Sequence, residues 1–218
     1  MANPFLPLNT YIADGEPHVF GNRVYLFGSH DKAGGDTYCM RNYEFWSAPV
    51  EDLETWSCKG VSYRADQDPL YGEKLKYMYA PDVVQGNDGR LYLYYCMSGE
   101  KGAGGYGGPI SVAVCDTPDG HYEYYGFVRN PDGSPMLKYV TFDPAVINDA
   151  GVIRLYYGTW YPFHEYGELL EPIFRKVESK LFGKTVAEIR ACPDGIMGAN
   201  HVILADDMLT IVSEPCHI

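Results

Sequence analysis

The chain has 218 residues, enough for one large core or two small ones, and a net charge of −12 from 29 acidic and 17 basic side chains. A charge of this sign is repelled by nucleic-acid backbones and anionic membrane surfaces, so we expect neither as a partner. The 20 Tyr, 24 Gly and 15 Pro residues indicate short strands separated by many turns.

The sequence lacks several signals that would indicate a particular compartment or a cofactor. Residues 1–5 have neither the basic nor the apolar region of a signal peptide, and no stretch is long and apolar enough to span a membrane, so we expect a cytoplasmic protein. The six cysteines contain no Cys-x-x-Cys pair, and several lie in apolar runs. We therefore expect free, buried thiols and no zinc site. The histidines also lack metal-ligand spacing, and the sequence demands no cofactor.

The first predicted element is an acidic turn at residues 14–17, which leads into an aromatic strand at residues 24–27. Related segments follow at residues 80–95 and 142–158, each with a short strand, an Asn, Asp or Gly turn and an aromatic strand. In this alignment Asp14, Pro81 and Asp143 fall at equivalent positions, with offsets of 81 − 14 = 67 and 143 − 81 = 62 residues. A repeated unit of about 65 residues is therefore predicted.

Each unit also has a second half. Residues 44–56, 110–124 and 201–212 each read as a strand, a turn and a strand, which gives about four strands per unit. Units of this kind indicate an all-β propeller, with blades at about 10–75, 76–138 and 139–215 in one partial domain spanning 1–218. Propellers close with about four to eight blades. Three blades leave open edges, which we expect self-association or a second fragment to cover.

One segment interrupts the third unit. Between residues 171 and 190, Ile173, Val177 and Leu181 recur at helical spacing, with Phe174 near them and Pro172 at the start. This pattern predicts a short amphipathic helix inserted into the third blade.

Asp14 and Asp143 are the candidate catalytic residues. They stand at equivalent positions in two units, and the innermost strands of a propeller converge at one mouth, so the repeat would bring both carboxylates into one pocket. The alternative is that each aspartate only shapes a turn, Asp14 with Gly15 and Asp143 with Pro144.

Three segments carry a resemblance to a known family. The stretches ADGEPHVFGNRVYLFGS (13–29), YAPDVVQGNDGRLYLYY (79–95) and FDPAVINDAGVIRLYYG (142–158) resemble the first three blades of glycoside hydrolase family 43. The stretch ANHVILADDMLTIVSEP (199–215) resembles the close of the third blade. This family comprises β-xylosidases, α-L-arabinofuranosidases and arabinanases on a five-bladed propeller, so the resemblance implies a hydrolase of xylan- or arabinan-derived sugars. Some relatives carry a structural cation such as calcium in the propeller axis, which this sequence does not demand.

The resemblance also implies roles for individual residues. Catalysis in the family is inverting; Asp14 matches the general base, and Asp143 matches the residue that raises the pKa of the general acid and orients it. An inverting pair of carboxyl groups stands roughly 6.5–9.5 Å apart to admit a water molecule. Tyr79 matches a position that often stacks on a sugar ring, although it could equally be a core tyrosine. Trp160 and His30 are candidates for contacting substrate, with core packing and a loop role as their respective alternatives.

The general acid of the family is a Glu at the start of the next blade, and the sequence ends before that motif. Glu16, Glu73, Glu165, Glu168 and Glu171 remain, and none lies in the matching motif. We therefore expect the isolated chain to hydrolyse unactivated glycosides very slowly. Two alternatives stay open: a non-catalytic, vestigial carbohydrate-binding propeller completed by another chain, and a member of another five-bladed carbohydrate-active family.

Overall fold

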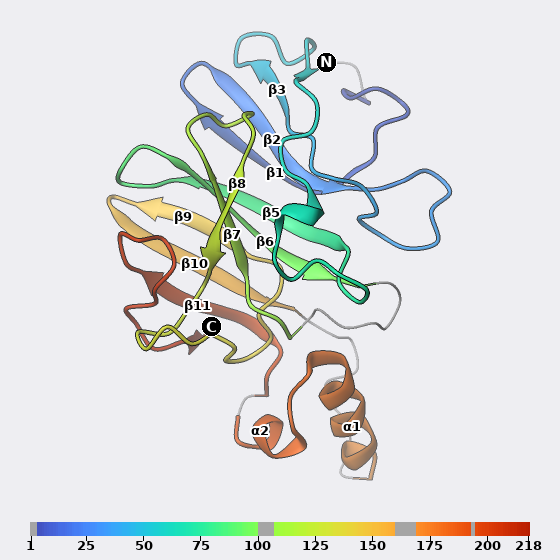
Figure 1. Ribbon diagram of the computed structural model, residues 1–218, viewed down its shortest axis with the longest axis vertical. Helices are drawn as coiled ribbons and strands as arrows, with labels where there is room; N and C mark the ends of the chain where they lie inside the picture. Colours follow the sequence, from blue (N-terminus) through green and yellow to red (C-terminus); the bar gives the residue numbers. More distant parts are fainter. Residues whose placement is uncertain (1–3, 100–106, 160–168, 193–194) are drawn as a thin grey trace.

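The computed structural model describes residues 4–99, 107–159, 169–192 and 195–218. In these ranges three antiparallel sheets of four strands follow one another in chain order, and two α-helices lie beyond the third sheet, at the bottom of the view in Figure 1. The predicted all-β architecture of four-stranded blades with a short helical insertion is therefore confirmed. No helix in the described part of the chain is long and apolar enough to cross a membrane.

In each sheet, strands that are consecutive in the chain pair with each other. The first sheet contains β1 (Ile12–Phe20), β2 (Arg23–His30), β3 (Trp46–Pro49) and β4 (Ser57–Cys58), followed by a 3₁₀ turn at Ala65–Gln67. The second contains β5 (Tyr77–Gln85), β6 (Leu91–Ser98), β7 (Ser111–Cys115) and β8 (Glu123–Phe127). The third contains β9 (Ala145–Asp149), β10 (Val152–Thr159), β11 (Gly198–Leu204) and β12 (Cys216–His217). Because β5 contacts both β1 and β9, these first strands form the hub of the molecule.

The middle sheet is buried on both faces. Alternate side chains of β6 enter two different cores, as the two-residue period of a strand requires. Leu91, Leu93, Tyr95 and Met97 join the core shared with the first sheet, whereas Tyr92, Tyr94 and Cys96 join the core shared with the third. A strand covered on both sides reads as an unbroken apolar run, which explains the composition of residues 91–97.

The fourth strand of the third sheet differs from the prediction. The strand–turn–strand pattern at residues 201–212 placed it near residues 208–212, but this segment makes only isolated bridges, from Thr210 to Arg129 and from Ile211 to Leu204. The strand that pairs with β11 is β12, through Asn200 with His217 and His201 with Cys216. The prediction failed because two short polar–apolar segments follow β11 and hydrophobic pattern alone does not say which of them pairs.

The predicted helix is present as α1 (Glu171–Phe182), followed by α2 (Val186–Arg190). Of the three residues at helical spacing, Ile173 is 59% exposed and Val177 is 40% exposed, whereas Leu181 packs against the core. The side chains of Glu178 and Phe182 are buried instead. A repeat at helical spacing identifies an apolar face but not the face that the rest of the chain covers.

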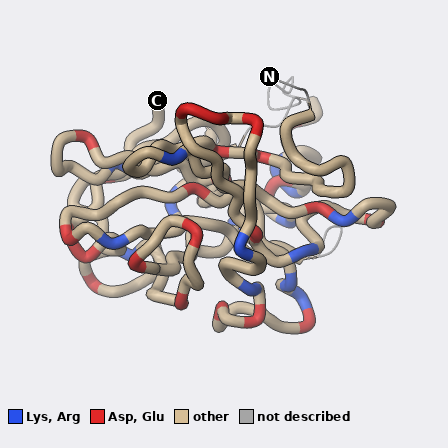
Figure 2. The backbone as a smooth tube through the Cα atoms, turned by 90° about the horizontal axis from the view of Figure 1, so that it is seen from above, with Lys and Arg blue, Asp and Glu red and all other residues tan. Residues whose placement is uncertain are grey.

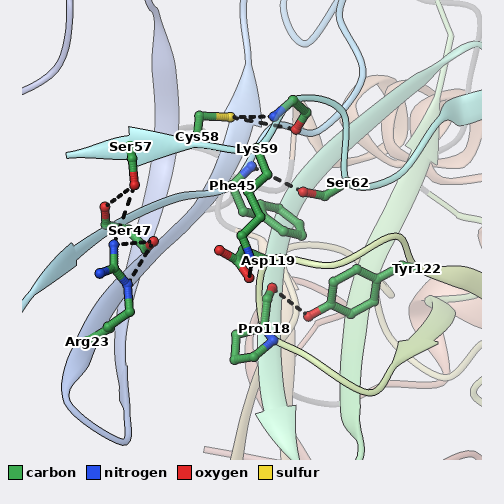
Figure 3. A network of polar contacts seen from close by, with 11 residues as sticks. Arg23, Phe45, Ser47, Ser57, Cys58, Lys59, Ser62, Pro118, Asp119 and Tyr122 are labelled. Carbon is green, nitrogen blue, oxygen red and sulfur yellow. Dashed lines mark hydrogen bonds and ion pairs between the residues drawn. The ribbon is translucent and has the colours of Figure 1, made fainter.

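Polar contacts join the outer parts of the first and second sheets. Lys59, beside β4, donates to Asp119 in the turn between β7 and β8 (2.9 Å), as Figure 3 shows. Within the first sheet, Arg23 donates to the Ser47 hydroxyl (2.9 Å). Acidic and basic positions are spread over many loops rather than gathered in one patch (Figure 2), so the net charge does not mark a single charged surface.

Gly28 in β2 is a testable packing constraint. A Cβ atom on Gly28 would lie 2.4 Å from Ile12 Cγ2 and 2.8 Å from the Ala13 carbonyl oxygen. We predict that Gly28→Ala lowers the free energy of unfolding by about 1–3 kcal/mol, the usual cost of overpacking, as measured by urea denaturation. Gly72→Ala is the matched control, because nothing lies within 4 Å of its added Cβ. Equal stability of the two variants would contradict the packing argument.

Candidate active site

The three sheets share one backbone irregularity at the start of their inner strands. Asp14, Ala80 and Asp143 all have positive φ angles, of 50°, 43° and 45°. In β1 and β5 the pairing register shifts at this point, between Ala13 and Glu16 and between Tyr79 and Asp82. Residues other than glycine adopt this conformation at a cost of order 1–3 kcal/mol, and such strain often lies at functional sites.

This irregularity corrects the alignment of the repeats. The residue of the second unit equivalent to Asp14 and Asp143 is Ala80, one position before the Pro81 that the alignment predicted. The offsets are therefore 80 − 14 = 66 and 143 − 80 = 63 residues. Two of the three equivalent positions carry a carboxylate, and the middle unit carries a methyl group.

Asp14 is held by a hydrogen bond from the neighbouring strand. The Ser29 hydroxyl donates to Asp14 Oδ2 (3.1 Å) and accepts from the Ala80 amide (2.8 Å). Ser29 itself is fully buried. One hydroxyl thus links the carboxylate of the first sheet to the bulge of the second, while Asp14 itself remains exposed to solvent.

Asp143 borders a pocket of about 380 Å³, which is also lined by Tyr156, Gly158, Thr159 and Ala199, among others. The residue keeps access to solvent. The protein packed around its carboxyl group, and secondarily the negative charge of Asp14, raise its pKa to about 6. The charge of Asp14 is the second cause of the raised pKa of Asp143, so the two carboxylates interact electrostatically.

Two buried thiols are influenced by the charges of the aspartates. Cys39 is 2% exposed, and burial raises its pKa to about 12, with smaller contributions from the charges of Asp31, Asp14 and Asp143. Burial likewise raises the pKa of Cys96, and the charge of Asp143 raises it further. Both thiols stay protonated at neutral pH and belong to the buried core that also holds Tyr79 and Phe142, rather than acting as nucleophiles.

A third carboxylate, Asp82, lies at the hub and is 3% exposed. Its Oδ1 accepts from His18 Nε2 (2.6 Å) and from the Val83 amide (2.8 Å), and its Oδ2 accepts from the Val146 amide (2.6 Å). Burial alone would lower the pKa of His18, but the hydrogen bond and charge of Asp82, together with the charge of Glu16, outweigh it and raise that pKa. Asp82 is therefore bonded to the inner strands of all three sheets.

The candidate substrate contacts have different surroundings. His30 is 3% exposed, and its Nδ1 lies 3.2 Å from the Asn42 carbonyl oxygen and 3.8 Å from Glu44 Oε2. Tyr79 is 9% exposed and belongs to the core between the second and third sheets, with its ring 5.8 Å from that of Phe142. Trp160 lies outside the described residues. Substrate contacts by these three residues remain predictions.

Ser29, Cys39 and Asp82 were not identified from the sequence. The sequence carried a signal for Ser29. It lies at the end of the aromatic strand, next to the candidate His30, and successive side chains of a strand point to opposite faces, so Ser29 would face away from His30. Asp82 had none, because its partners are a histidine 64 residues earlier and a backbone amide 64 residues later. Among the described residues, no group of three or more His, Cys, Asp or Glu side chains is arranged to hold a metal ion.

Comparison with known proteins gives a consistent match. The family model described as "Glycosyl hydrolases family 43" matches residues 2–207. A curated xylosidase/arabinosidase of Thermoclostridium stercorarium is 40% identical over 220 residues, covering 98% of this chain and 38% of that protein. Xylosidase/arabinosidase 43A of Humicola insolens is 31% identical, with 69% of this chain and 44% of that protein covered.

Solved structures agree on the fold. The GH43_1 enzyme from Xanthomonas citri, solved in complex with xylose, matches with a TM-score of 0.66 and 21% identity over 99% of this chain and 57% of that one. A β-xylosidase/α-arabinofuranosidase from a compost metagenome, solved with xylotriose, matches with a TM-score of 0.63 and 23% identity over 99% and 61%. The chain thus spans well under two thirds of the length of each of these relatives.

The electrostatic link between the two aspartates can be measured. Asp14→Asn removes a negative charge that disfavours ionisation of Asp143, so we predict that the pKa of Asp143 falls below its value of about 6. It should stay above the ordinary aspartate value, because burial, the larger cause, is unchanged. Carbon-13 NMR titration of the carboxyl group, assigned with Asp143→Asn, gives both values. An unchanged pKa would show that the two carboxylates do not share a site.

Proposed function

Because the chain belongs to glycosyl hydrolase family 43, we propose that it forms part of an inverting glycosidase acting on xylose- or arabinose-containing oligosaccharides. The curated relatives of Thermoclostridium and Humicola carry xylosidase/arabinosidase names, and two of the matching structures hold xylose or xylotriose. Cytoplasmic trimming of oligosaccharides is part of the proposal, and six free cysteines fit a reducing compartment.

One observation supports this proposal above the others: Asp14 and Asp143 occupy the same strained backbone position in two sheets, and the charge of one acts on the other. We assign Asp14 as the general base that activates water. A general base must be reachable by the attacking water, and Asp14 is open to solvent, with its Oδ2 accepting a hydrogen bond from the Ser29 hydroxyl. Asp143 would then raise the pKa of the general acid through the repulsion between like charges.

The general acid is not found among the glutamates with described surroundings. Glu171 accepts hydrogen bonds from Arg190 and Arg175, which hold its pKa below the ordinary value and keep it ionised. Glu16 has a pKa raised by burial and by the charge of Asp82, but it lies two residues from Asp14 on the same strand. A general acid has to protonate the leaving group on the opposite side of the sugar from the base. Glu165 and Glu168 lie outside the described residues, and neither stands in the sequence motif that carries the family's acid. We therefore propose that the acid comes from outside these 218 residues.

The open faces of the first and third sheets support a partner. His201 lies on the face of β11 away from the core. Among the described residues, its Nε2 and the Nε1 of Trp46 on β3 are buried and have no hydrogen-bond partner. Ile147, on the same face of the third sheet as His201, is 45% exposed. A partner on this uncovered face would remove the exposed Ile147 side chain from water, so we propose that a second fragment or a second copy covers these faces. The missing acid would come from that partner.

A non-catalytic module is the second candidate, because the chain as described supplies no general acid. It predicts binding of an oligosaccharide without turnover. Calorimetry with xylotriose, run beside the hydrolysis assay, separates it from the glycosidase: binding by a completed propeller that still shows no hydrolysis would favour the module.

Hydrolysis tests the role of Asp14. We predict slow release of nitrophenol from aryl β-xyloside or aryl α-L-arabinofuranoside by the chain alone, and faster release when the segment that follows the matched region of the Thermoclostridium relative is added. Asp14→Asn should lower the stimulated rate by about 10²–10⁴-fold, the usual contribution of general-base catalysis. Glu73→Gln, which alters an exposed loop carboxylate, should leave it unchanged. Full activity of Asp14→Asn would rule out the assigned base.

Sedimentation tests the open face. We predict that the chain associates in a concentration-dependent manner, and that Ile147→Lys weakens this association because it places a charge on the open face of the third sheet. Leu137→Lys is the control, because Leu137 is similarly exposed (40%) but lies in a loop. A chain that remains monomeric, and does not bind the added segment, would contradict the partner proposal.

A further inference from the structure

We propose that Asp82 is a positioning residue that sets the spacing of Asp14 and Asp143, because it clamps β1 and β9 onto β5. This inference rests on the proposed function, in which the two aspartates act as one site. Asp82 is not offered as a catalytic residue, since it is buried and its oxygens accept hydrogen bonds from protein donors.

The clamp reaches both aspartate-bearing strands. His18 follows Asp14 by four residues on β1, and Val146 follows Asp143 by three residues on β9. At about 3.3 Å per strand residue, each contact lies about 10–13 Å along the strand from its aspartate. Each strand is therefore fixed within a few residues of the carboxylate that it carries. In the described structure, Asp82 is bonded to both strands at short distances of 2.6 Å.

The chemistry of the clamp requires a carboxylate. An ionised carboxylate is an acceptor only, and here it receives three donors from three strands. An amide of the same shape keeps one acceptor oxygen and turns an N–H₂ group toward a donor, which leaves a buried group unsatisfied. The Asp82→Asn substitution therefore weakens the clamp with almost no change in volume.

His18 is itself held in place. Its ring lies 5.9 Å from that of Phe27 and 6.1 Å from that of Phe20, which limits its rotation. The nearby charge of Glu16 supports the protonated form of His18, as does Asp82. The contact between β1 and β5 is therefore a charge-assisted hydrogen bond between two restrained side chains, stronger than a neutral one.

A matched control joins two of the same strands elsewhere. Asn148, two residues beyond Val146 on β9, donates to the Gln85 carbonyl (3.1 Å) at the end of β5. It links β9 to β5 without reaching β1, and it lies farther from the aspartates than the clamp does. Asn148→Ala thus removes a contact between inner strands without touching Asp82.

The experiment measures the coupling between the two aspartates. The coupling is the fall in the pKa of Asp143 caused by Asp14→Asn, obtained by NMR titration in the full chain. It is measured in the wild-type background and again in the Asp82→Asn background. Any direct effect of the Asp82 charge on Asp143 cancels in this double-mutant comparison. We expect the coupling in the Asp82→Asn background to be less than half of its wild-type value.

Equal coupling in both backgrounds, with both proteins folded by circular dichroism, would overturn the proposal. So would an equal loss of coupling in Asn148→Ala, because the effect would then reflect general loosening of the hub. If Asp82→Asn does not fold, His18→Phe replaces it, since this variant keeps the bond to Val146. His18→Phe should reduce the coupling, and His18→Gln, which retains a donor, should restore it; unchanged coupling in His18→Phe would also refute the clamp.

The readout does not depend on turnover. A chain that hydrolyses nothing can still show the coupling and its loss, so failure of the glycosidase proposal and failure of the clamp are distinguishable. In an active assembly, Asp82→Asn should lower kcat with little effect on KM, because Asp82 does not touch the substrate.

Discussion

The strained backbone position at the start of each inner strand is the constraint on which the site depends. It occurs three times, at Asp14, Ala80 and Asp143, always with a positive φ angle in a residue other than glycine. In β1 it puts two residues, Asp14 and Gly15, opposite Gly28. The extra residue aims the Asp14 side chain away from the regular alternation of the strand. The fold therefore supplies three equivalent places for a functional side chain, and this sequence uses two of them for carboxylates.

Concentrated negative charge at the hub explains the perturbed groups together. Asp14, Glu16 and Asp82 all lie on the inner strands, and Asp143 lies two residues before the start of β9. After burial, the charges of neighbouring carboxylates are the main reason that the pKa values of Glu16 and Asp143 are raised. Asp82 has a different role, because its carboxylate oxygens accept three hydrogen bonds from the protein and hold the inner strands together. Carboxylates of one type thus take different roles according to whether their partners are protein donors or solvent.

The sequence predicted the sheets well because each unit combines turn residues with an aromatic strand, two signals that reinforce each other. The predictions of local detail were wrong where the sequence carries no local signal. The bulge at Ala80 was placed one residue late, because nothing in the amino-acid sequence shows that this alanine adopts a positive φ angle. The helix α1 was found, but its spacing did not show that Ile173 and Val177 would be exposed. Asp82 was missed because its bonds join segments distant in the chain.

The alternation of β6 between two cores has a consequence for how this gene can vary. Insertion or deletion of a single codon within residues 91–97 would exchange the two sets of side chains, sending Tyr92 and Tyr94 into the space shaped for Leu91 and Leu93. Both cores would be mispacked at once. Length variation among natural homologues should therefore be confined to the connections on either side of this strand, whereas point substitutions that preserve volume are tolerated within it.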